Sequence, residues 1–269
     1  MEKLVIIPTY NEKENIANII NAVFSLNQGF HILVIDDGSP DGTAELVKLK
    51  MQDHPGALFL EERKGKLGLG TAYIHGFKWA IKKGYAFIFE MDADFSHNPS
   101  DLQRLYEACK YGGADLSVGS RYVSGGGNVN WPWDRILLSR GASVYTRLIT
   151  WMPVNDSTAG FVCYQKHVLE AIDLDEIMFV GYAFQIEMKF ASWKLGFKMK
   201  EVPIIFEDRR FGVSKMNKGI VKEGILGVLK LKWYSLFKDY RRRVKKKSER
   251  TLFTSSHPRM EMGSERHDS

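Results

Sequence analysis

Strand-length apolar runs alternate with helical stretches between residues 4 and 118, and this rhythm limits the fold more than any other feature of the sequence. Because the apolar runs are almost continuous, they predict an α/β fold with a mostly parallel sheet covered by helices on both faces. The runs cover residues 4–7, 32–35, 86–91 and 116–118, and the helical stretches lie near residues 16–26, 44–51, 72–83 and 101–111. Ligands bind at the carboxyl ends of the strands in such sheets, so the polar residues after these ends are the candidates for function.

The 269-residue chain is long enough for one large α/β domain, and its elements become less regular beyond Gly119. The later elements are expected to be a loop at residues 124–127, helices at 134–150 and 183–195, and strands near 161–164 and 198–206. We predict three parts: a main domain over residues 1–217, an apolar interfacial helix over 218–240, and a basic, then polar, disordered tail over 241–269.

The segment at residues 218–237 is rich in Ile, Leu, Val and aromatic side chains, yet charged residues interrupt it at Lys222, Glu223, Lys230 and Lys232. It is therefore too polar for an ordinary membrane span. Its polar residues are not confined to one face, and the pattern predicts a helix that is partly packed and partly interfacial.

The positive charge of the chain is concentrated near its carboxyl end. The formal net charge is +6, and residues 238–250 alone carry eight basic and two acidic side chains. The remainder is balanced, which argues against a nucleic-acid-binding surface spread over the domain and favours a tether to anionic lipid on the cytoplasmic face of a membrane. A solvated, disordered tail is the alternative. No apolar signal region follows Met1, and Cys109 and Cys163 lack metal-ligand spacing, so we expect buried thiols in a reducing, cytoplasmic compartment.

An aromatic ring and several carboxylates follow the first two strands, at Pro8, Tyr10, Glu12, Asp36 and Asp37. Because these strand ends are neighbours in the predicted sheet, they form a plausible pocket for a base and its ribose. In the alternative interpretation, Asn11 and Asp41 only cap the helices that follow. A glycine-rich stretch at residues 64–70 precedes the third helix and could cradle an anion at the helix N-terminus.

A later strand opens directly into Asp92-Ala93-Asp94. Two carboxylates so close together repel each other unless a cation lies between or beside them, and hard oxygen ligands suit Mg²⁺ or Mn²⁺. A metal of this kind acts as a Lewis acid on a leaving diphosphate. In the alternative interpretation, Asp94 and Ser96 only begin a turn before the helix at Asp101.

Basic residues follow later strands of the chain. Arg121 ends one strand, and a late loop carries Arg209 and Lys215. Arginine suits phosphate because its planar fork donates two parallel hydrogen bonds. Arg135 and Ser139 are spaced i, i+4, so on a helix they share a face that can grip one phosphate. Taken alone, Arg135 is interpreted as a surface residue.

In this order the motifs resemble those of the polyprenol-phosphate (dolichol-phosphate) mannose synthases, within glycosyltransferase family 2 and its GT-A fold. The resemblance extends from about Lys3 to Lys215, with motifs at residues 7–12, 35–39, 66–70, 91–94, 119–122, 156–161, 181–187 and 209–215. The chain departs from the family at Ser96, where Gln is common, and at Val162, where a basic residue is frequent. Many relatives also carry carboxy-terminal membrane helices, and this chain resembles the short form without them.

The resemblance implies a GT-A catalytic domain that transfers mannose from GDP-mannose to a polyprenyl phosphate at a membrane surface. The implied donor-binding residues are Pro8, Tyr10, Glu12, Asp36, Asp37, Asp92, Ala93, Asp94, Arg209 and Lys215. Within this set Asp92 and Asp94 hold Mg²⁺ or Mn²⁺, and Ser96 leaves a third metal-side ligand in doubt. The acceptor phosphate is expected at Arg121, Arg135 and Ser139, and the expected catalytic residues are Asp94 and Arg121.

A phosphate acceptor changes the chemistry that the site must supply. Because the second pKa of a phosphate monoester is about 6, the acceptor is largely dianionic at neutral pH and needs no general base. Direct displacement by this phosphate inverts the anomeric centre and gives a β-mannosyl phosphate. Three alternatives stay open: a polyprenyl-phosphate glucose synthase using UDP-glucose, a transferase to a saccharide hydroxyl with Glu187 as base, and a non-catalytic nucleotide-binding or scaffold protein.

Overall fold

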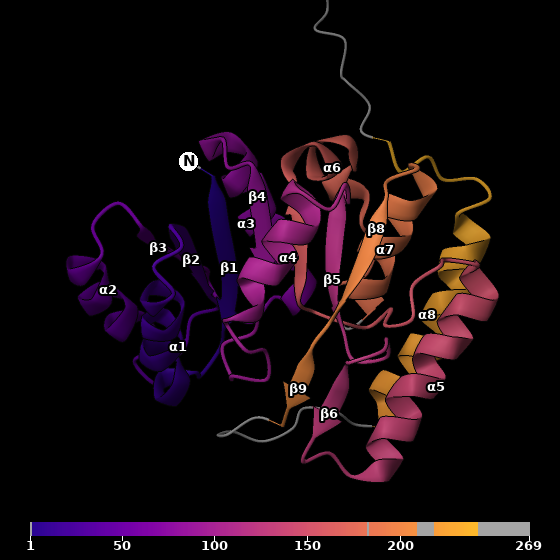
Figure 1. Cartoon of the computed structure of the whole chain (residues 1–269), viewed down its shortest axis with the longest axis horizontal. Helices are drawn as coiled ribbons and strands as arrows, with labels where there is room; N and C mark the ends of the chain where they lie inside the picture. Colours follow the sequence, from indigo (N-terminus) through magenta and orange to yellow (C-terminus); the bar gives the residue numbers. More distant parts are fainter. Residues whose placement is uncertain (1, 182, 209–217, 242–269) are drawn as a thin grey trace, which may run out of the picture.

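A large and a small β-sheet form the frame of the molecule (Figure 1). The computed structural model describes residues 2–181, 183–208 and 218–241. The large sheet has seven strands in the order β3-β2-β1-β4-β7-β5-β8. They are β1 (Lys3–Thr9), β2 (Phe30–Asp36), β3 (Leu58–Glu62), β4 (Phe87–Glu90), β5 (Leu116–Ser120), β7 (Val162–Gln165) and β8 (Met199–Pro203). The small sheet pairs β6 (Gly127–Val129) in parallel with β9 (Ile205–Glu207).

Helices cover both faces of the large sheet, which confirms the predicted fold class. Alternate residues of β1 enter opposite core layers: Leu4 and Ile6 belong to the layer with α3 and α7, and Val5 and Ile7 to the layer with α1 and α4. The helices are α1 (Lys13–Ser25), α2 (Thr43–Asp53), α3 (Leu69–Lys83), α4 (Asp101–Lys110), α5 (Trp133–Thr150), α6 (Lys166–Ala171), α7 (Ala183–Lys194) and α8 (Lys218–Tyr234), with a 3₁₀ turn η1 at Leu174–Glu176.

The sequence analysis did not predict α6 and η1, and three further elements differ from the prediction. β3 was missed because it is an edge strand that ends in two glutamates rather than a continuous apolar run. The single strand expected at 198–206 is divided into β8 and β9, because β8 ends at Pro203, whose nitrogen carries no hydrogen, and the chain then crosses to the small sheet. The loop expected at 124–127 is a turn, closed by a 2.9 Å hydrogen bond from the Gly126 amide to the Val123 carbonyl, that leads directly into β6.

One edge of the large sheet collects the carboxyl ends of β1, β2, β3, β4, β5 and β8. The reason is the antiparallel strand β7, which lies between β4 and β5 and leaves the strands on its two sides running the same way. β7 therefore starts at this edge, and the segment before it also ends there. In Figure 1 the edge is the lower end of the strands, next to β6 and β9.

α8 lies beside α5 on the outside of the domain (Figure 1). Its Val228 and Leu231 side chains are buried, whereas Leu229 and Trp233 are exposed, so the helix is partly packed. Its expected place at an interface stays a prediction. Among the described residues, no helix is both long and apolar enough to cross a membrane.

Candidate active site

A cavity of about 780 Å³ lies where the carboxyl edge of the sheet meets α5 and α8. Its wall combines polar side chains from the strand ends with apolar side chains from the helices. The predicted metal-binding and acceptor-binding residues all contribute to this wall, at Asp92, Asp94, Arg121, Arg135 and Ser139. Residues that are separated in sequence therefore share one site.

The carboxylates of Asp92-Ala93-Asp94 directly follow β4 and differ in exposure. Asp94 is 8% exposed, and its Oδ1 accepts hydrogen bonds from the amide of Ser96 at 3.0 Å and from the Ser96 hydroxyl at 2.6 Å. The Asp92 side chain is 39% exposed and lines the cavity. Ala93 is buried, and Phe95 has a left-handed backbone with φ of 61°, which marks a strained turn immediately after the motif.

This pair of carboxylates fits a divalent cation that takes its other ligands from substrate phosphate and water. In the described part of the chain, no three His, Cys, Asp or Glu side chains converge as a complete metal site. The Ser96 hydroxyl donates its hydrogen to Asp94, so its observed role is to orient that carboxylate. Substrate oxygens would thus complete the coordination.

His97 is a site residue that the sequence pattern does not reveal. Its ring is 2% exposed, stacks on Phe161 with the centroids 4.8 Å apart, and meets the Phe206 ring edge-on at 5.4 Å. Its Nδ1 accepts a hydrogen bond from the Asp92 amide at 3.4 Å. Burial lowers the pKa of the imidazole to about 4, so the ring is neutral at pH 7. The only sequence signal is a histidine three residues after a strand-end carboxylate.

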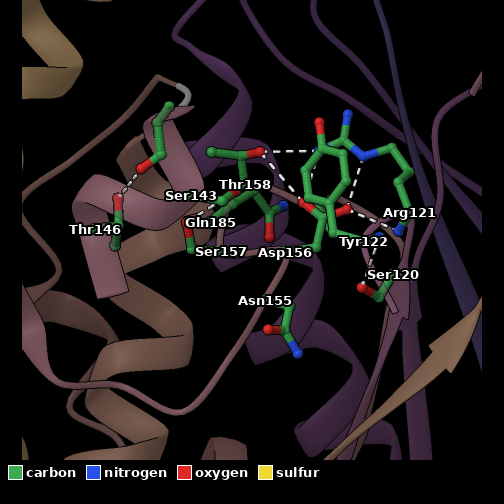
Figure 2. Close-up of polar contacts among 12 residues, drawn as sticks. Ser120, Arg121, Tyr122, Ser143, Thr146, Asn155, Asp156, Ser157, Thr158 and Gln185 are labelled. Carbon is green, nitrogen blue, oxygen red and sulfur yellow. Dashed lines mark hydrogen bonds and ion pairs between the residues drawn. The ribbon is translucent and has the colours of Figure 1, made fainter. Parts of the chain in front are cut away.

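Arg121 follows β5, and its guanidinium is already paired with Asp156 (Figure 2). Nε and Nη2 donate to the two Asp156 oxygens at 2.7 Å each, and the Arg121 amide donates to the same carboxylate at 3.0 Å. Nη2 also donates to the Thr158 hydroxyl at 2.9 Å. Burial disfavours the charged guanidinium, but its hydrogen bonds to Asp156 raise the pKa of Arg121 above the ordinary value. Arg121, the predicted phosphate-binding residue, is thus part of a buried ion pair in which Asp156 neutralises its charge.

Arg135 has a similar arrangement at the start of α5. Its Nη1 donates to both carboxylate oxygens of Asp208, at 3.0 and 3.1 Å, and its guanidinium lies 3.9 Å over the Trp131 ring. The same ring lies 5.4 Å from the Arg121 guanidinium, so one indole joins the two arginines. The Arg135 side chain is 20% exposed, so the surface-residue interpretation is wrong. Ser139 follows one turn later on α5 and lines the same cavity.

Asp36 and Asp37, at the end of β2, are held by the protein itself. Asp36 is 1% exposed and accepts hydrogen bonds from the Thr9 hydroxyl at 2.9 Å and from the Ser39 hydroxyl at 2.6 Å. Asp37 Oδ1 accepts from Arg63 Nε at 2.6 Å. Arg63 is a further residue that the sequence did not suggest. These two aspartates lie outside the cavity wall and shape the neighbouring strand ends.

Pro8, Tyr10 and Glu12 also lie outside the cavity wall, at the end of β1, and all three are half-buried. The Lys66 ammonium lies 5.0 Å over the Tyr10 ring, and Glu12 accepts a hydrogen bond from the Asn15 amide group at 2.9 Å. The aromatic ring predicted to receive a base is thus next to a cation. Arg209 and Lys215, the predicted diphosphate ligands, lie outside the described residues.

The helix-capping alternative holds for Asp41 and is wrong for Asn11. Asp41 Oδ1 accepts a 3.0 Å hydrogen bond from the Thr43 amide, at the first residue of α2. Asn11 has a left-handed backbone with φ of 58°, and α1 begins after Glu12 without a side-chain cap.

The amides where the glycine-rich stretch at 64–70 enters α3 are bonded within the protein, so they do not contribute to the predicted anion cradle. At the start of α3, the Gly70 amide donates to the Val180 carbonyl at 2.9 Å, and the next two amides donate to the Gly68 carbonyl. A Cβ on Gly70 would lie 2.7 Å from the Phe184 ring. These amides are therefore occupied, and the glycine serves close packing of α3 against α7.

A buried lysine and a buried glutamate lie behind the cavity. Lys189 is fully buried on α7, and its Nζ donates to the Ala159 carbonyl at 2.6 Å and to the Gln185 carbonyl at 3.0 Å. Burial lowers the pKa of Lys189 to about 8 and raises the pKa of Glu90, at the end of β4, to about 8, while their mutual attraction opposes both shifts. Lys189 thereby holds the segment that carries Asp156 against the sheet.

Glu187 is not placed to act as a general base. Its side chain is completely buried, and Oε2 accepts hydrogen bonds from the amides of Met178 at 2.8 Å and Phe179 at 3.0 Å. It does not line the cavity. Its observed role is to hold the loop before α7.

A mostly parallel α/β sheet whose carboxyl edge presents two carboxylates beside a cavity lined by arginines is typical of a GT-A glycosyltransferase. The chain belongs to glycosyl transferase family 2, whose profile matches residues 4–173, and it is therefore an enzyme of that class. This membership confirms the resemblance found in the motifs.

Curated relatives match most of the chain. A polyprenol monophosphomannose synthase from Mycolicibacterium smegmatis is 46% identical over 225 residues, which cover 84% of this chain and 84% of that protein. An undecaprenyl-phosphate mannosyltransferase from Micrococcus luteus is 44% identical over 228 residues, which cover 85% and 93%.

Solved structures confirm the GT-A fold. A glucosyl-3-phosphoglycerate synthase from Mycobacterium tuberculosis, in complex with Mn²⁺, UDP and phosphoglyceric acid, superposes with a TM-score of 0.66 at 15% identity, covering 86% of this chain and 78% of that one. A mannosyltransferase from Pyrobaculum calidifontis, in complex with GDP-Man and Mn²⁺, has a TM-score of 0.55 at 17% identity, covering 88% and 64%.

Proposed function

We propose that this enzyme transfers mannose from GDP-mannose to the phosphate of a polyprenyl phosphate, with inversion at the anomeric carbon. The names of the two curated relatives, both more than 40% identical, support this activity. One observation in the molecule carries the proposal: a single cavity contains the Asp92 and Asp94 carboxylates, two arginines and an apolar wall. Such a cavity suits two phosphates and the start of a lipid chain.

On the donor side, Asp92 and Asp94 are proposed to hold Mg²⁺ or Mn²⁺, and the metal supplies Lewis-acid stabilisation of the leaving diphosphate. Two structural neighbours contain Mn²⁺ with a nucleotide or nucleotide sugar, which supports a divalent cation. The guanosine part is assigned to the strand ends at Pro8, Tyr10, Glu12, Asp36 and Asp37, with Ala93 beside the sugar and Arg209 and Lys215 on the diphosphate.

On the acceptor side, Arg121, Arg135 and Ser139 are proposed to bind the phosphate. Each arginine is already neutralised by an aspartate, so the site offers directed N–H groups rather than a large excess of positive charge. The dianionic acceptor phosphate attacks without a base. A hydroxyl acceptor needs one, and the buried, hydrogen-bonded Glu187 does not supply it.

The lipid chain is assigned to the apolar part of the cavity wall. This part comes from three helices, at Leu137, Leu138, Tyr145, Ile186 and Val228. Because Val228 belongs to α8, the interfacial helix expected at 218–240 contributes to the same site as the domain expected at 1–217. The acceptor phosphate can then reach the arginines while the chain follows the two helices outward.

Membrane contact is assigned to the outer face of α5 and α8. Exposed apolar side chains lie on these helices or directly after them, at Trp133, Leu137, Val144, Leu148, Trp151, Leu226, Leu229, Trp233, Leu236 and Phe237. Such a face lies stably at a bilayer surface, where a polyprenyl phosphate presents its headgroup. The basic residues at 238–250, most of which lie outside the described residues, would attract the anionic cytoplasmic leaflet. We therefore infer a peripheral enzyme on the cytoplasmic face of a membrane.

The proposal is tested by measuring GDP release from GDP-mannose with Mn²⁺, with and without a short polyprenyl phosphate. We expect release that depends on the acceptor, and a product whose mannosyl phosphate is β by nuclear magnetic resonance. UDP-glucose in place of GDP-mannose tests the glucose synthase alternative. Acceptor-independent release, or transfer from UDP-glucose alone, would contradict the proposed function.

A further inference from the structure

We propose that His97 is a phosphate-binding residue whose Nε2–H donates a hydrogen bond to an anionic phosphate oxygen in the cavity. The inference rests on the proposed function of this site, which places two phosphates there. It assigns a ligand contact to a residue outside the site predicted from the sequence.

The position of the ring proton follows from one hydrogen bond. The Asp92 amide donates to His97 Nδ1 at 3.4 Å, and a nitrogen that accepts a hydrogen bond carries no proton. The proton of the ring is therefore on Nε2. His97 is thus a donor on its far side, and it is not set up to offer Nε2 as a metal ligand.

The direction of this donor is fixed by packing on both sides of the ring. Phe161 stacks on one face with an interplanar angle of 13°, and the Phe206 ring stands edge-on at 79°. The Phe206 ring also lies 5.4 Å from the Arg121 guanidinium. One aromatic ring therefore sets the spacing between the His97 donor and the predicted acceptor-binding arginine.

The Nε2–H group of His97 is not used in a hydrogen bond between described residues of the protein. In the described part of the chain Nε2 makes no hydrogen bond, and the ring lines the cavity beside Asp92 and Asp94. The Nε2–H group is therefore available to a ligand in the cavity, and a phosphate oxygen would accept its hydrogen bond. Because Arg121 and Arg135 are each paired with an aspartate, a further hydrogen-bond donor in the same cavity adds to phosphate binding.

The oxygen that His97 meets can belong to the leaving diphosphate or to the acceptor phosphate, and separate titrations distinguish the two. Pyrophosphate with Mn²⁺ represents the leaving group, and geranyl phosphate represents the acceptor. Neither titration needs turnover, so both remain informative if mannose transfer itself is not observed. Failure of the proposed function and failure of this inference are therefore distinguishable.

Three substitutions separate the two nitrogens of the ring. His97→Phe keeps the ring and removes both nitrogens, His97→Asn places an amide near the Nδ1 position, and His97→Gln places one near Nε2. We expect His97→Phe and His97→Asn to lower the affinity for one of the two phosphate ligands by about 10- to 100-fold, the range for a hydrogen bond to a charged group. His97→Gln should retain part of that affinity. His31→Phe is the control, since His31 lies near the start of β2, at the opposite edge of the sheet.

Thermal melting of each variant shows whether the fold is intact. If His97→Phe unfolds, the comparison of the Gln and Asn variants still decides the question. The inference is overturned if His97→Asn binds both phosphates as tightly as the wild type, because the role of His97 would then be confined to the Asp92 amide. Equal binding by folded His97→Phe, or a wild-type protein that binds neither phosphate, overturns it as well.

Discussion

The strand-edge wall of the cavity and the wall formed by α5 and α8 hold their side chains in different ways. At the strand edge, Asp94 and Asp156 are buried and each accepts at least two hydrogen bonds. On the helical wall, Leu137 and Leu138 are 63% and 43% exposed. Charged groups are thus fixed where phosphates are proposed to react, and apolar groups are left open where lipid is proposed to lie.

This difference follows from the chemistry that each wall is proposed to serve. Phosphoryl oxygens and a metal require donors and ligands that are already oriented, because reorganisation during the reaction raises the barrier. An isoprenoid chain has no directional groups, so a loosely packed apolar surface is enough to receive it. Substitutions on the first wall should therefore affect catalysis and stability, and those on the second should affect association with membranes.

The largest effect is expected at the metal-binding carboxylates. Asp94→Asn keeps the size of the side chain but removes its charge, and we expect kcat/KM to fall by about 10³-fold because the leaving diphosphate loses its metal. Asp101→Asn is the matched control, since Asp101 is as buried as Asp94 but lies on α4 outside this cavity. Wild-type rates for Asp94→Asn would remove the metal assignment.

A smaller but substantial effect is expected from the buried ion pair. Asp156→Asn leaves the Arg121 guanidinium buried without a counter-charge, so we expect the free energy of unfolding to fall by about 3 kcal/mol. Urea denaturation followed by circular dichroism measures this change. Asp208→Asn, whose side chain is 32% exposed, should cost clearly less. Equal losses of stability in Asp156→Asn and Asp208→Asn would mean that the burial of an ion pair does not determine its contribution to stability.

A tightly packed glycine on α3 and an open glycine on α5 give a third comparison. Gly70→Ala forces a Cβ toward the Phe184 ring, and we expect a loss of about 2 kcal/mol in the free energy of unfolding. Gly141→Ala on α5 meets no atom within 4 Å, so it should stabilise the helix by about 0.5–1 kcal/mol. Thermal melting of the two variants shows whether each substitution lowers or raises the stability. A stabilised Gly70→Ala protein would contradict the packing explanation.

The smallest effect is expected on the outer face of α5 and α8. A double variant, Leu148→Glu with Leu229→Glu, places charges on the exposed face of α5 and α8, and we expect its affinity for anionic vesicles to fall by about tenfold. Transfer to a short, water-soluble prenyl phosphate should not change. Leu49→Glu on α2 is the control, because Leu49 is also exposed but lies away from this face. Unchanged sedimentation of the double variant with vesicles would show that the face does not bind lipid.

Much of the frame was accessible from local sequence. The runs at 4–7 and 32–35 are apolar throughout because those strands are buried on both faces, and that pattern needs no knowledge of the partner strands. Asp92 and Asp94 were predicted as metal ligands because two carboxylates one residue apart, directly after a buried strand, repel each other unless a cation binds them. β3 escaped because an edge strand needs no continuous apolar run.

The contacts that define the site were not accessible in this way. Arg121 is 35 positions from Asp156, and nothing in either segment indicates that they form a pair. His97 is oriented by Phe161 and Phe206, which reach it from β7 and β9 regions far along the chain. The glycine-rich stretch suggested anion binding, yet its Gly70 amide donates to the Val180 carbonyl.

The sequence alone thus determines the alternation of strands and helices, the carboxylate pair after β4 and the family. Each of these can be recognised from a short stretch of sequence, because it depends on local apolar patterns, turn residues or ordered motifs. The folded chain decides which arginines are already neutralised, which histidine faces the cavity and which apolar helices remain uncovered. Those properties depend on packing between segments that are distant in sequence, and the antiparallel strand β7 is what brings the Asp156 segment to the edge where β4 and β5 end.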